Sequence, residues 1–381
     1  MGKVDFLSIA VLVDDVKEPI NVREFSIKEG SLMVVSRKPN LTKEQIESSH
    51  YGGGGNIAPP ATVLGIKTGI MGYIGYDYEG EFFLEGMKKY GVNTEGIIKT
   101  KWHTDISIIP KYESGKRGPI AFFEGAGRYF DLTHKIKEKI LSLKPKVVQI
   151  SYSGLFDKGA DRNKGKNLAK MIKWLKEIDS IVMVDTHTYT SNPEKYELLK
   201  PSLYEANLFM CSNDEVELII PQYKINIASE SDDISKAYSF LEYLQRKFWR
   251  DVEDSRIFAV TAKNYVIIKY HTKKKYVITK LIENYYSSIK ALDAVGAGDS
   301  FRAGFNAYII NNLKKFKNGK INLNEAIQFA NLTALLYISG KGIEAFKNYK
   351  YMDLIRLVKK GKPEKPFYNI NEIYLQMNKK L

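Results

Sequence analysis

Apolar residues form short runs that alternate with amphipathic stretches along most of the chain. The first run, residues 6–13, is nearly continuous, which is typical of a strand buried on both faces of a parallel sheet. Further along, strands are predicted at 147–151, 181–185, 206–211 and 257–261, and an amphipathic helix at 167–178. Repeated strand and helix units of this kind predict a mostly parallel sheet with helices on both faces.

Other segments have a different pattern. Residues 104–110 and 119–123 are predicted as two strands joined by a polar loop, and 265–270 with 276–281 as a hairpin. Residues 16–50 are polar and interrupted, so we expect them to form part of a small lid. Helices are predicted at 303–313 and at 323–338, where Gly340 and Gly342 end the second one.

The stretch 293–305 reads DAVGAGDSFRAGF. Gly296 and Gly298 allow a tight turn that brings several N–H groups near one point, and the apolar spacing that follows predicts the start of a helix. A helix N-terminus has unpaired N–H donors and a positive partial charge, so it stabilises an anion such as a phosphate. Asp299 either caps this helix or accepts a proton beside the bound anion.

Two other polar clusters indicate a ligand. Asp14 and Asp15 follow the first apolar run, and ligands of open α/β sheets bind beyond the carboxyl ends of strands. The glycine run 52–55 precedes Asn56, and such a run is conformationally costly unless the backbone must approach a ligand closely. The alternatives are a turn or cap role for Asp15 and a flexible helix-capping turn at the glycines.

Composition narrows the function classes. The chain has 381 residues, 44% of them apolar, which is enough for one large domain or two smaller ones. The net charge of +14 comes from lysines spread along the chain, so we expect a solvated surface and no nucleic-acid binding. A basic field of this kind also attracts a phosphorylated nucleotide.

Several other classes are disfavoured. The single cysteine, Cys211, excludes an internal disulfide and is expected to be buried. No run approaches the ~18 apolar residues of a membrane helix, and the start has no signal pattern, so we expect a cytoplasmic protein without a membrane partner. The P-loop motif and the Gly-x-Ser-x-Gly motif of hydrolases are both missing from the sequence.

The glycine motif resembles the C-terminal signature of the ribokinase-like (PfkB) carbohydrate kinase family, Asp-Thr/Ser-x-Gly-Ala-Gly-Asp-x-Phe. The matching residues are Asp293, Gly296, Ala297, Gly298, Asp299 and Phe301, and Ala294 replaces Thr/Ser. The family's N-terminal signature, Gly-Gly-x-x-x-Asn-x-Ala, aligns on Asn56 and Ala58, with Tyr51 in place of its first glycine. The resemblance covers roughly residues 4–345.

Other family motifs are degraded. Of the nucleotide-binding Thr-x-Gly-x-x-Gly only Thr261 remains. In the Asn-x-x-Glu motif, which the family links to its magnesium and phosphate network, Glu215 fits the glutamate and Ser212 stands for the asparagine. The pose and identity of the nucleotide are therefore less well defined by the sequence than the catalytic motif is.

The resemblance implies a Rossmann-like three-layer α/β/α fold with a small β-sheet lid, in one domain spanning 1–381. The lid would comprise about 16–50 and 101–127, and 346–381 would be a C-terminal extension without an assigned role. The implied reaction transfers the γ-phosphoryl group of ATP, with Mg²⁺, to a hydroxyl of a sugar or related polyol.

The resemblance also implies residue roles. Asp299 would be the base, and the amides of Gly296, Ala297 and Gly298 would form the anion hole. The acceptor would be bound by Asp15, Gly52, Gly53 and Asn56, the nucleotide by Thr261, Asp293, Asn331 and Gly342, and the metal indirectly by Glu215.

Two alternatives remain open. The acceptor of the same enzyme type could be a nucleoside, or the scaffold could be a non-catalytic sugar or nucleoside sensor, as the lost nucleotide glycines would allow. Retention of Asp299 favours an enzyme over a sensor because pure binding needs no base. A homodimer formed through the lid is a further expectation.

Overall fold

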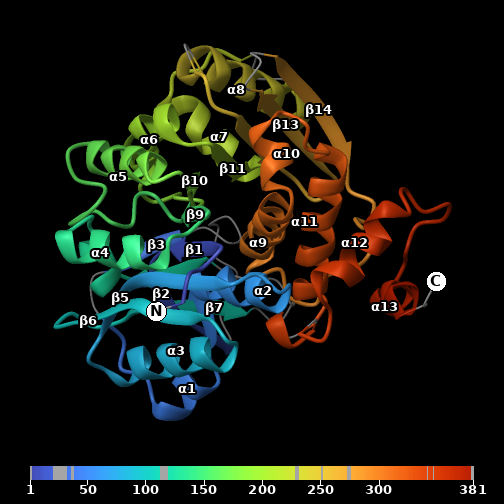
Figure 1. The fold of residues 1–381 in the computed structure, drawn as a ribbon. Coiled ribbons are helices and arrows are strands. Elements are labelled where there is room, and N and C mark those ends of the chain that lie inside the picture. Colours follow the sequence, from blue (N-terminus) through green and yellow to red (C-terminus); the bar gives the residue numbers. More distant parts are fainter. Residues whose placement is uncertain are drawn as a thin grey trace.

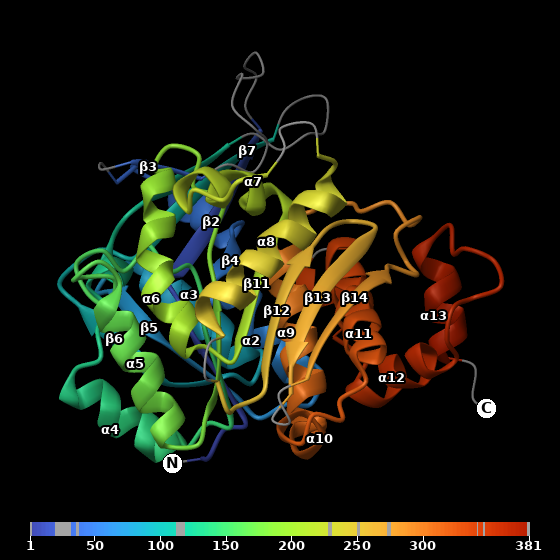
Figure 2. The ribbon, with the colours of Figure 1, turned by 90° about the horizontal axis from the view of Figure 1, so that it is seen from above.

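The computed structural model describes residues 2–19, 32–35, 38–111, 119–227, 231–249, 252–272, 276–340, 342–345 and 347–378 (Figures 1 and 2). Parts of both predicted lid segments, namely 20–31, 36, 37 and 112–118, lie outside these ranges.

Within the described residues, the larger sheet has nine strands, and those from β6 to β12 are parallel. In spatial order they are β14 (Val277–Glu283), β13 (Tyr265–His271), β12 (Arg256–Thr261), β11 (Leu208–Ser212), β10 (Ile181–Asp185), β9 (Val147–Ile150), β1 (Phe6–Ile9), β5 (Thr68–Gly75) and β6 (Asn93–Thr100). The antiparallel pair β13 and β14 confirms the predicted hairpin.

Each face of this sheet packs into its own apolar core. Alternate side chains of the central strands, such as Val182 and Val184 on one side and Ile181 and Met183 on the other, belong to different clusters. Both sets are buried, which explains why the central strands read as near-continuous apolar runs in the sequence. The three-layer α/β/α prediction is confirmed.

Helices cover both faces and include several that the sequence predicted. The helix predicted at 167–178 is α5 (Lys166–Glu177), and its expected apolar positions Leu168, Met171, Ile172 and Leu175 are all buried. The α-helices and 3₁₀ helices are α1 (Lys43–Glu47), η1 (Gly54–Asn56), α2 (Ala58–Val63), α3 (Tyr78–Lys89), η2 (Ala126–Tyr129), α4 (His134–Leu143), α5, η3 (Pro193–Leu199), α6 (Lys200–Glu205), α7 (Asn213–Gln222), α8 (Asp233–Phe248), α9 (Ala297–Asn311), α10 (Leu313–Lys317), α11 (Leu323–Ile338), η4 (Gly342–Ala345), α12 (Tyr351–Lys359) and α13 (Ile370–Asn378).

The prediction of one strand over 6–13 is wrong. β1 ends at Ile9, and after Ala10 and Val11 the chain enters β2 (Leu12–Pro19), which belongs to a second sheet. The carbonyl of Val11 accepts a hydrogen bond from the Gly54 N–H (3.1 Å), outside the ladder of the first sheet. Asp15 therefore lies inside a strand of the second sheet, and not at the end of a strand in the first.

The second sheet has five strands among the described residues, in the order β3 (Leu32–Val35), β8 (Ile120–Phe123), β7 (Asp105–Lys111), β2 and β4 (His50–Gly53). The strands predicted at 104–110 and 119–123 are β7 and β8, which pair antiparallel. Whether this sheet closes as a lid or pairs with a second chain stays a prediction.

The C-terminal segment forms α12 and α13, which lie at the right of Figure 1. Leu354, Val358, Phe367 and Ile373 are buried in the same apolar cluster as α9 and α11, so this segment packs on the main core. Within the described residues, no helix has both the length and the apolar character that crossing a membrane requires.

Helices α9 and α11 lie side by side (Figure 1), and Gly304 of α9 faces α11. A Cβ atom on Gly304 would stand 2.5 Å from Thr333 Oγ1, 2.7 Å from Thr333 Cβ and 3.1 Å from Ala330 Cα. Because the nearest obstacles include helix backbone, the two helices could not accommodate a side chain here without separating.

We expect Gly304→Ala to lower the free energy of unfolding by about 1–3 kcal/mol, because overpacking outweighs the helix propensity of alanine. Urea unfolding followed by circular dichroism measures the change. Lys173→Ala on the exposed face of α5 is the control and should stay within about 0.5 kcal/mol of the wild type. An unchanged midpoint for Gly304→Ala would contradict the close approach.

The side chain of Asp105 links β7 to the segment that follows β8. It is buried in β7, and its carboxylate accepts hydrogen bonds from the N–H groups of Gly125 (2.7 Å) and Gly127 (2.8 Å). Burial, the largest cause, raises its pKa to about 7. The carboxyl is thus preferentially protonated in the folded state, so its contribution to stability is present at low pH and is lost as pH rises through about 7.

We therefore expect the stability of the wild type relative to Asp105→Asn to fall between pH 5 and pH 8, by about 2 kcal/mol. Urea midpoints of both proteins at the two pH values provide the measurement. If the difference between the two proteins is the same at both pH values, Asp105 does not titrate in this window.

Candidate active site

Helix α9 begins directly after Gly296, whose φ of 79° and ψ of 6° place it in the left-handed region. Glycine adopts this conformation without the cost that a Cβ atom adds. No side chain caps the first turn, so its N–H groups and the positive end of the helix dipole face out of the helix. One of the three amides expected in the anion hole is engaged, because the Ala297 N–H donates to the Ala294 carbonyl (3.2 Å).

Asp299 lies in this first turn and is buried. Its Oδ2 accepts a hydrogen bond from the Tyr152 hydroxyl (2.7 Å), and its Oδ1 accepts one from Nη2 of Arg302 (3.2 Å). Burial raises the pKa of Asp299, while the Arg302 charge opposes that rise and the nearby Asp185 charge adds to it. The result is a carboxylate more basic than an exposed one.

Tyr152 follows β9 with a φ of 63°, an uncommon conformation for a residue with a side chain. Its N–H donates to Asp185 Oδ1 (2.8 Å), which holds the backbone in place. Burial and the Asp299 charge raise the pKa of Tyr152 well above its usual value, so its hydroxyl stays a hydrogen-bond donor. Strained backbone of this kind is concentrated at functional sites.

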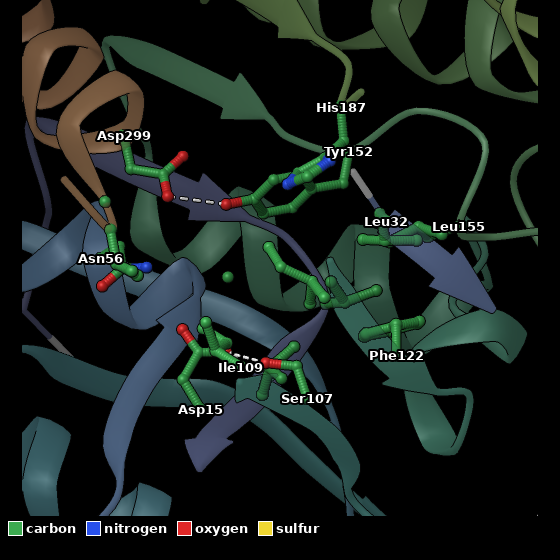
Figure 3. A pocket seen from close by; sticks show the side chains of 16 residues that line it. Asp15, Leu32, Asn56, Ser107, Ile109, Phe122, Tyr152, Leu155, His187 and Asp299 are labelled. Carbon is green, nitrogen blue, oxygen red and sulfur yellow. Dashed lines mark hydrogen bonds between the residues drawn. The ribbon is translucent and has the colours of Figure 1, made fainter. Parts of the chain in front are cut away.

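A pocket opens beside Asp299 between the two sheets and encloses about 490 Å³, part of it open to solvent. Figure 3 shows Asp299, Asn56 and Asp15 on one side of this pocket and Leu32, Leu155 and Phe122 on the other. The pocket therefore has a polar half that ends at Asp299 and an apolar half formed largely by the smaller sheet.

Asp15 contributes its carboxylate to the polar half. Its Oδ1 accepts a hydrogen bond from the Ser107 hydroxyl of β7 (Figure 3). Gly52 of β4 pairs with Val13 of β2, two residues before Asp15, and a Cβ atom on Gly52 would overlap the Asp15 carboxylate. Gly52 thus makes room for Asp15, while Gly53 lines the pocket itself with a φ of 56°.

Asn56 lies between the smaller sheet and the start of α9. Its Oδ1 accepts a hydrogen bond from the Tyr337 hydroxyl (2.8 Å) of α11. The Tyr337 ring is also the nearest neighbour that a Cβ atom on Gly296 or Gly342 would meet. Tyr337 thus contacts Asn56, which was predicted to bind the acceptor. It also lies beside Gly296 and Gly342, which were predicted to bind the phosphoryl group and the nucleotide.

The residues predicted to bind the nucleotide are not part of this pocket's lining. Asp293 and Gly342 lie near the end of α11, where the Asp293 N–H donates to the Ile338 carbonyl (3.1 Å). Thr261 lies at the end of β12 beside Ser212, and Asn331 has a buried Nδ2 without a hydrogen-bond partner. Their nucleotide role stays a prediction.

Glu215 forms a capping box with Ser212 at the start of α7, accepting the Ser212 N–H at Oε2 (2.6 Å). Its Oε1 is buried without a hydrogen-bond partner, and burial raises its pKa to about 7. No group of three or more His, Cys, Asp or Glu residues in the described ranges could hold a metal ion. Cys211 is buried and free, as predicted.

Sequence reasoning missed Tyr152, Asp185, Arg302 and Tyr337. Two of these had a signal: Arg302 stands three residues after Asp299 on one helix face, and Asp185 ends a buried strand. Tyr152 and Tyr337 are indistinguishable by pattern from the many other tyrosines of the chain.

Comparison with protein families matches residues 22–231, more than half of the chain, to the pfkB family carbohydrate kinases. Among curated proteins, "Probable fructokinase-5" of Arabidopsis thaliana is 24% identical over 297 residues, covering 75% of this chain and 81% of that protein. The 5-dehydro-2-deoxygluconokinase of Listeria monocytogenes is 23% identical over 274 residues, covering 69% and 75%.

Solved structures share the fold. Adenosine kinase from Schistosoma mansoni in complex with 2-fluoroadenosine aligns with a TM-score of 0.68 and 15% identity, covering 90% of this chain and 97% of that one. Fructokinase with bound ATP from Xylella fastidiosa aligns with a TM-score of 0.66 and 13% identity, covering 94% and 99%. The fold, the match to the family and the glycine motif at α9 agree: the chain belongs to the pfkB family of carbohydrate kinases, phosphotransferases that act on an alcohol group.

Proposed function

We propose that this kinase transfers the γ-phosphoryl group of ATP to a hydroxyl of a sugar or related polyol, with Asp299 as the base. The observation that carries the proposal is the position of Asp299: it is buried in the uncapped first turn of α9 and lines the same pocket as Asp15 and Asn56. Asp299, the start of α9, Asp15 and Asn56 therefore line one pocket, which supports the roles proposed for them.

In the proposed reaction, the acceptor hydroxyl lies against Asp299 and gives it a proton. The hydroxyl oxygen forms a bond to the γ-phosphorus, the bond from that phosphorus to the bridging oxygen breaks, and ADP leaves. The raised pKa of Asp299 suits this role because a general base works best when its pKa is close to the pH of the reaction.

Charge on the transferred phosphoryl oxygens would be stabilised at the glycine loop by N–H groups that are already oriented. Since the Ala297 amide is bonded to Ala294, the Gly296 and Gly298 amides are the better candidates in this conformation. Preoriented donors are effective here because they need no rearrangement during the reaction.

Asp15 and Asn56 are proposed to hold the acceptor. An ionised carboxylate accepts strong hydrogen bonds from neighbouring hydroxyls, which suits a diol. Asp15 is already held by Ser107, so its orientation is set before the acceptor arrives.

The residues fit Mg²⁺ only indirectly. Glu215 has one buried carboxylate oxygen without a hydrogen-bond partner, which suits a contact to a water of a hydrated ion. When bound with the nucleotide, Mg²⁺ supplies positive charge that neutralises the phosphates. Thr261, Asp293, Asn331 and Gly342 remain the proposed contacts of the nucleotide.

A second candidate acceptor is a nucleoside. The apolar half of the pocket, with Leu32, Phe122 and Leu155, offers a surface for a base that a small polyol would leave uncovered. The polar half would then hold the ribose hydroxyls against Asp15 and Asn56. A panel of acceptors separates the two candidates.

Asp299→Asn tests the base. We expect turnover to fall by at least ~10²-fold with the fold intact, because an amide cannot take the acceptor's proton. ADP release is measured with ATP, Mg²⁺ and a panel of sugars, polyols, inositols and nucleosides.

The control is Asp232→Asn, the same substitution at the exposed N-cap of α8, which should keep full turnover. Near-normal turnover by Asp299→Asn would reject this base. If the wild type binds members of the panel and releases no ADP with any of them, the sensor alternative is favoured.

Gly52→Ala tests the acceptor site. The new Cβ would displace the Asp15 carboxylate, so we expect the KM for the acceptor to rise about tenfold or more and the KM for ATP to stay within about threefold.

Gly54→Ala is a matched control in the same glycine run, since its Cβ would meet the side-chain ends of Ile70 and Leu12 at 3.0 Å and the Ala10 Cβ at 3.4 Å, and not the Asp15 carboxylate. An unchanged acceptor KM for Gly52→Ala would show that Asp15 does not hold the acceptor.

A further inference from the structure

Three polar residues on one face of α9 point toward the carboxyl ends of β9 and β10. They are Asp299, Arg302 and Asn306, spaced three and four residues apart, and all are buried. Asn306 Nδ2 donates to Gln149 Oε1 of β9 (2.6 Å), so the helix is attached to the sheet by a buried polar contact as well as by apolar packing. Arg302 lies between this attachment and the proposed base.

The guanidinium of Arg302 contacts two carboxylates. Nη2 donates to Asp299 Oδ1 (3.2 Å), and Nε lies 3.0 Å from Asp185 Oδ2 in an ion pair without hydrogen-bond alignment. The Arg302 side chain is only 9% exposed. Removing one partner from a buried ion pair of this kind is costly because the other charge is left uncompensated.

Asp185 is itself firmly held. Its Oδ2 accepts hydrogen bonds from Gln149 Nε2 and the Ser151 hydroxyl, and its Oδ1 accepts the Tyr152 N–H, all at 2.8 Å. Because these donors come from β9 and the segment after it, Asp185 is a fixed point of the sheet. A continuous series of polar contacts therefore connects the sheet, through Asp185 and Arg302, to Asp299.

The same guanidinium lies against the glycine loop. A Cβ atom on Gly298 would stand 3.5 Å from Arg302 Nη1 and 3.7 Å from Nη2. The surrounding carboxylates of Asp185, Asp299 and Glu215 would repel a phosphoryl group, and the charge of Arg302 offsets this repulsion next to the amides where the group would be held.

We propose that Arg302 is a positioning residue for phosphoryl transfer: anchored on Asp185, it holds Oδ1 of Asp299 while the Tyr152 hydroxyl holds Oδ2, so that the orientation of the carboxylate is fixed, and it places a positive charge beside the Gly298 loop. This inference rests on the proposed function, in which Asp299 is the base.

The test compares Arg302→Met and Arg302→Lys with Arg256→Met. Arg256 is a matched control: it is also buried in an ion pair, with Nε 2.9 Å from Asp254 Oδ1, but it is the first residue of β12 and so lies at the amino end of that strand, whereas the site lies beyond the carboxyl ends of β9 and β10. Both methionine variants lose a buried charge, so both are expected to lose stability. The kcat of each variant is therefore calculated for the folded fraction of the protein alone.

We expect Arg302→Met to lower kcat by about 10²-fold with the acceptor KM within about threefold of the wild type, and Arg256→Met to keep kcat. Arg302→Lys should recover at least about tenfold over Arg302→Met, since the charge returns without the two-pronged geometry. Equal kcat values for the two methionine variants would overturn the proposal.

The pH profile gives a second readout that a purely structural role would not move. Asp299 is faced by Arg302 of the same helix, Tyr152 after β9, Asn56 of η1 and Asp185 of β10. Of these, Arg302 supplies the positive charge that favours the ionised carboxylate. Its removal should move the acidic limb of the kcat profile to higher pH, and an unmoved limb would argue against the contact.

Binding of inorganic phosphate, measured by calorimetry, separates the inference from the proposed function. If the wild type shows no turnover with any acceptor, the proposed function fails, while weaker phosphate binding in Arg302→Met than in Arg256→Met would still support the charge beside the loop. Equal phosphate affinity in the two variants would remove that part of the proposal whatever the activity.

Discussion

The structure depends on one constraint: helix α9 must be held firmly although the N–H groups of its first turn have no side-chain cap. The stability of this turn therefore has to come from elsewhere. The helix packs against α11 and the sheet in a buried apolar cluster, and Asn306 and Arg302 add buried polar contacts to β9 and β10. The end of α9 that is proposed to bind the phosphoryl group is thus placed by contacts further along the same helix.

Much of the fold could be predicted because the relevant physics is local. Buried parallel strands read as apolar runs, and α5 shows its buried face as a helical period, so both were recognised. The change of sheet between Ile9 and Leu12 was not, because residues 6–13 are apolar throughout and an apolar run does not record which sheet buries it. The hydrogen bond from Gly54 to Val11, which marks the change, joins residues distant in sequence.

The same distinction applies to the site. Gly296 and Asp299 belong to a contiguous motif and were recognised, while Tyr152 and Tyr337 act through contacts across the fold that no local pattern encodes. Gly52 was predicted as a ligand contact, and the structure adds a different reason for a glycine there, the space needed by Asp15. The nucleotide contacts are the least defined part because the sequence motifs that would mark them are degraded.

The change of sheet after Ile9 has an energetic consequence for the pocket. Asp15 and Ser107 belong to the smaller sheet, while Asp299 and Arg302 belong to a helix packed on the larger one. An acceptor bound as proposed, in contact with both Asp15 and Asp299, would therefore link the two sheets, and part of its binding free energy would act on their relative position. Discrimination between acceptors bound in this way would then depend on how well each one spans the gap between the sheets, as well as on the groups it meets on either side.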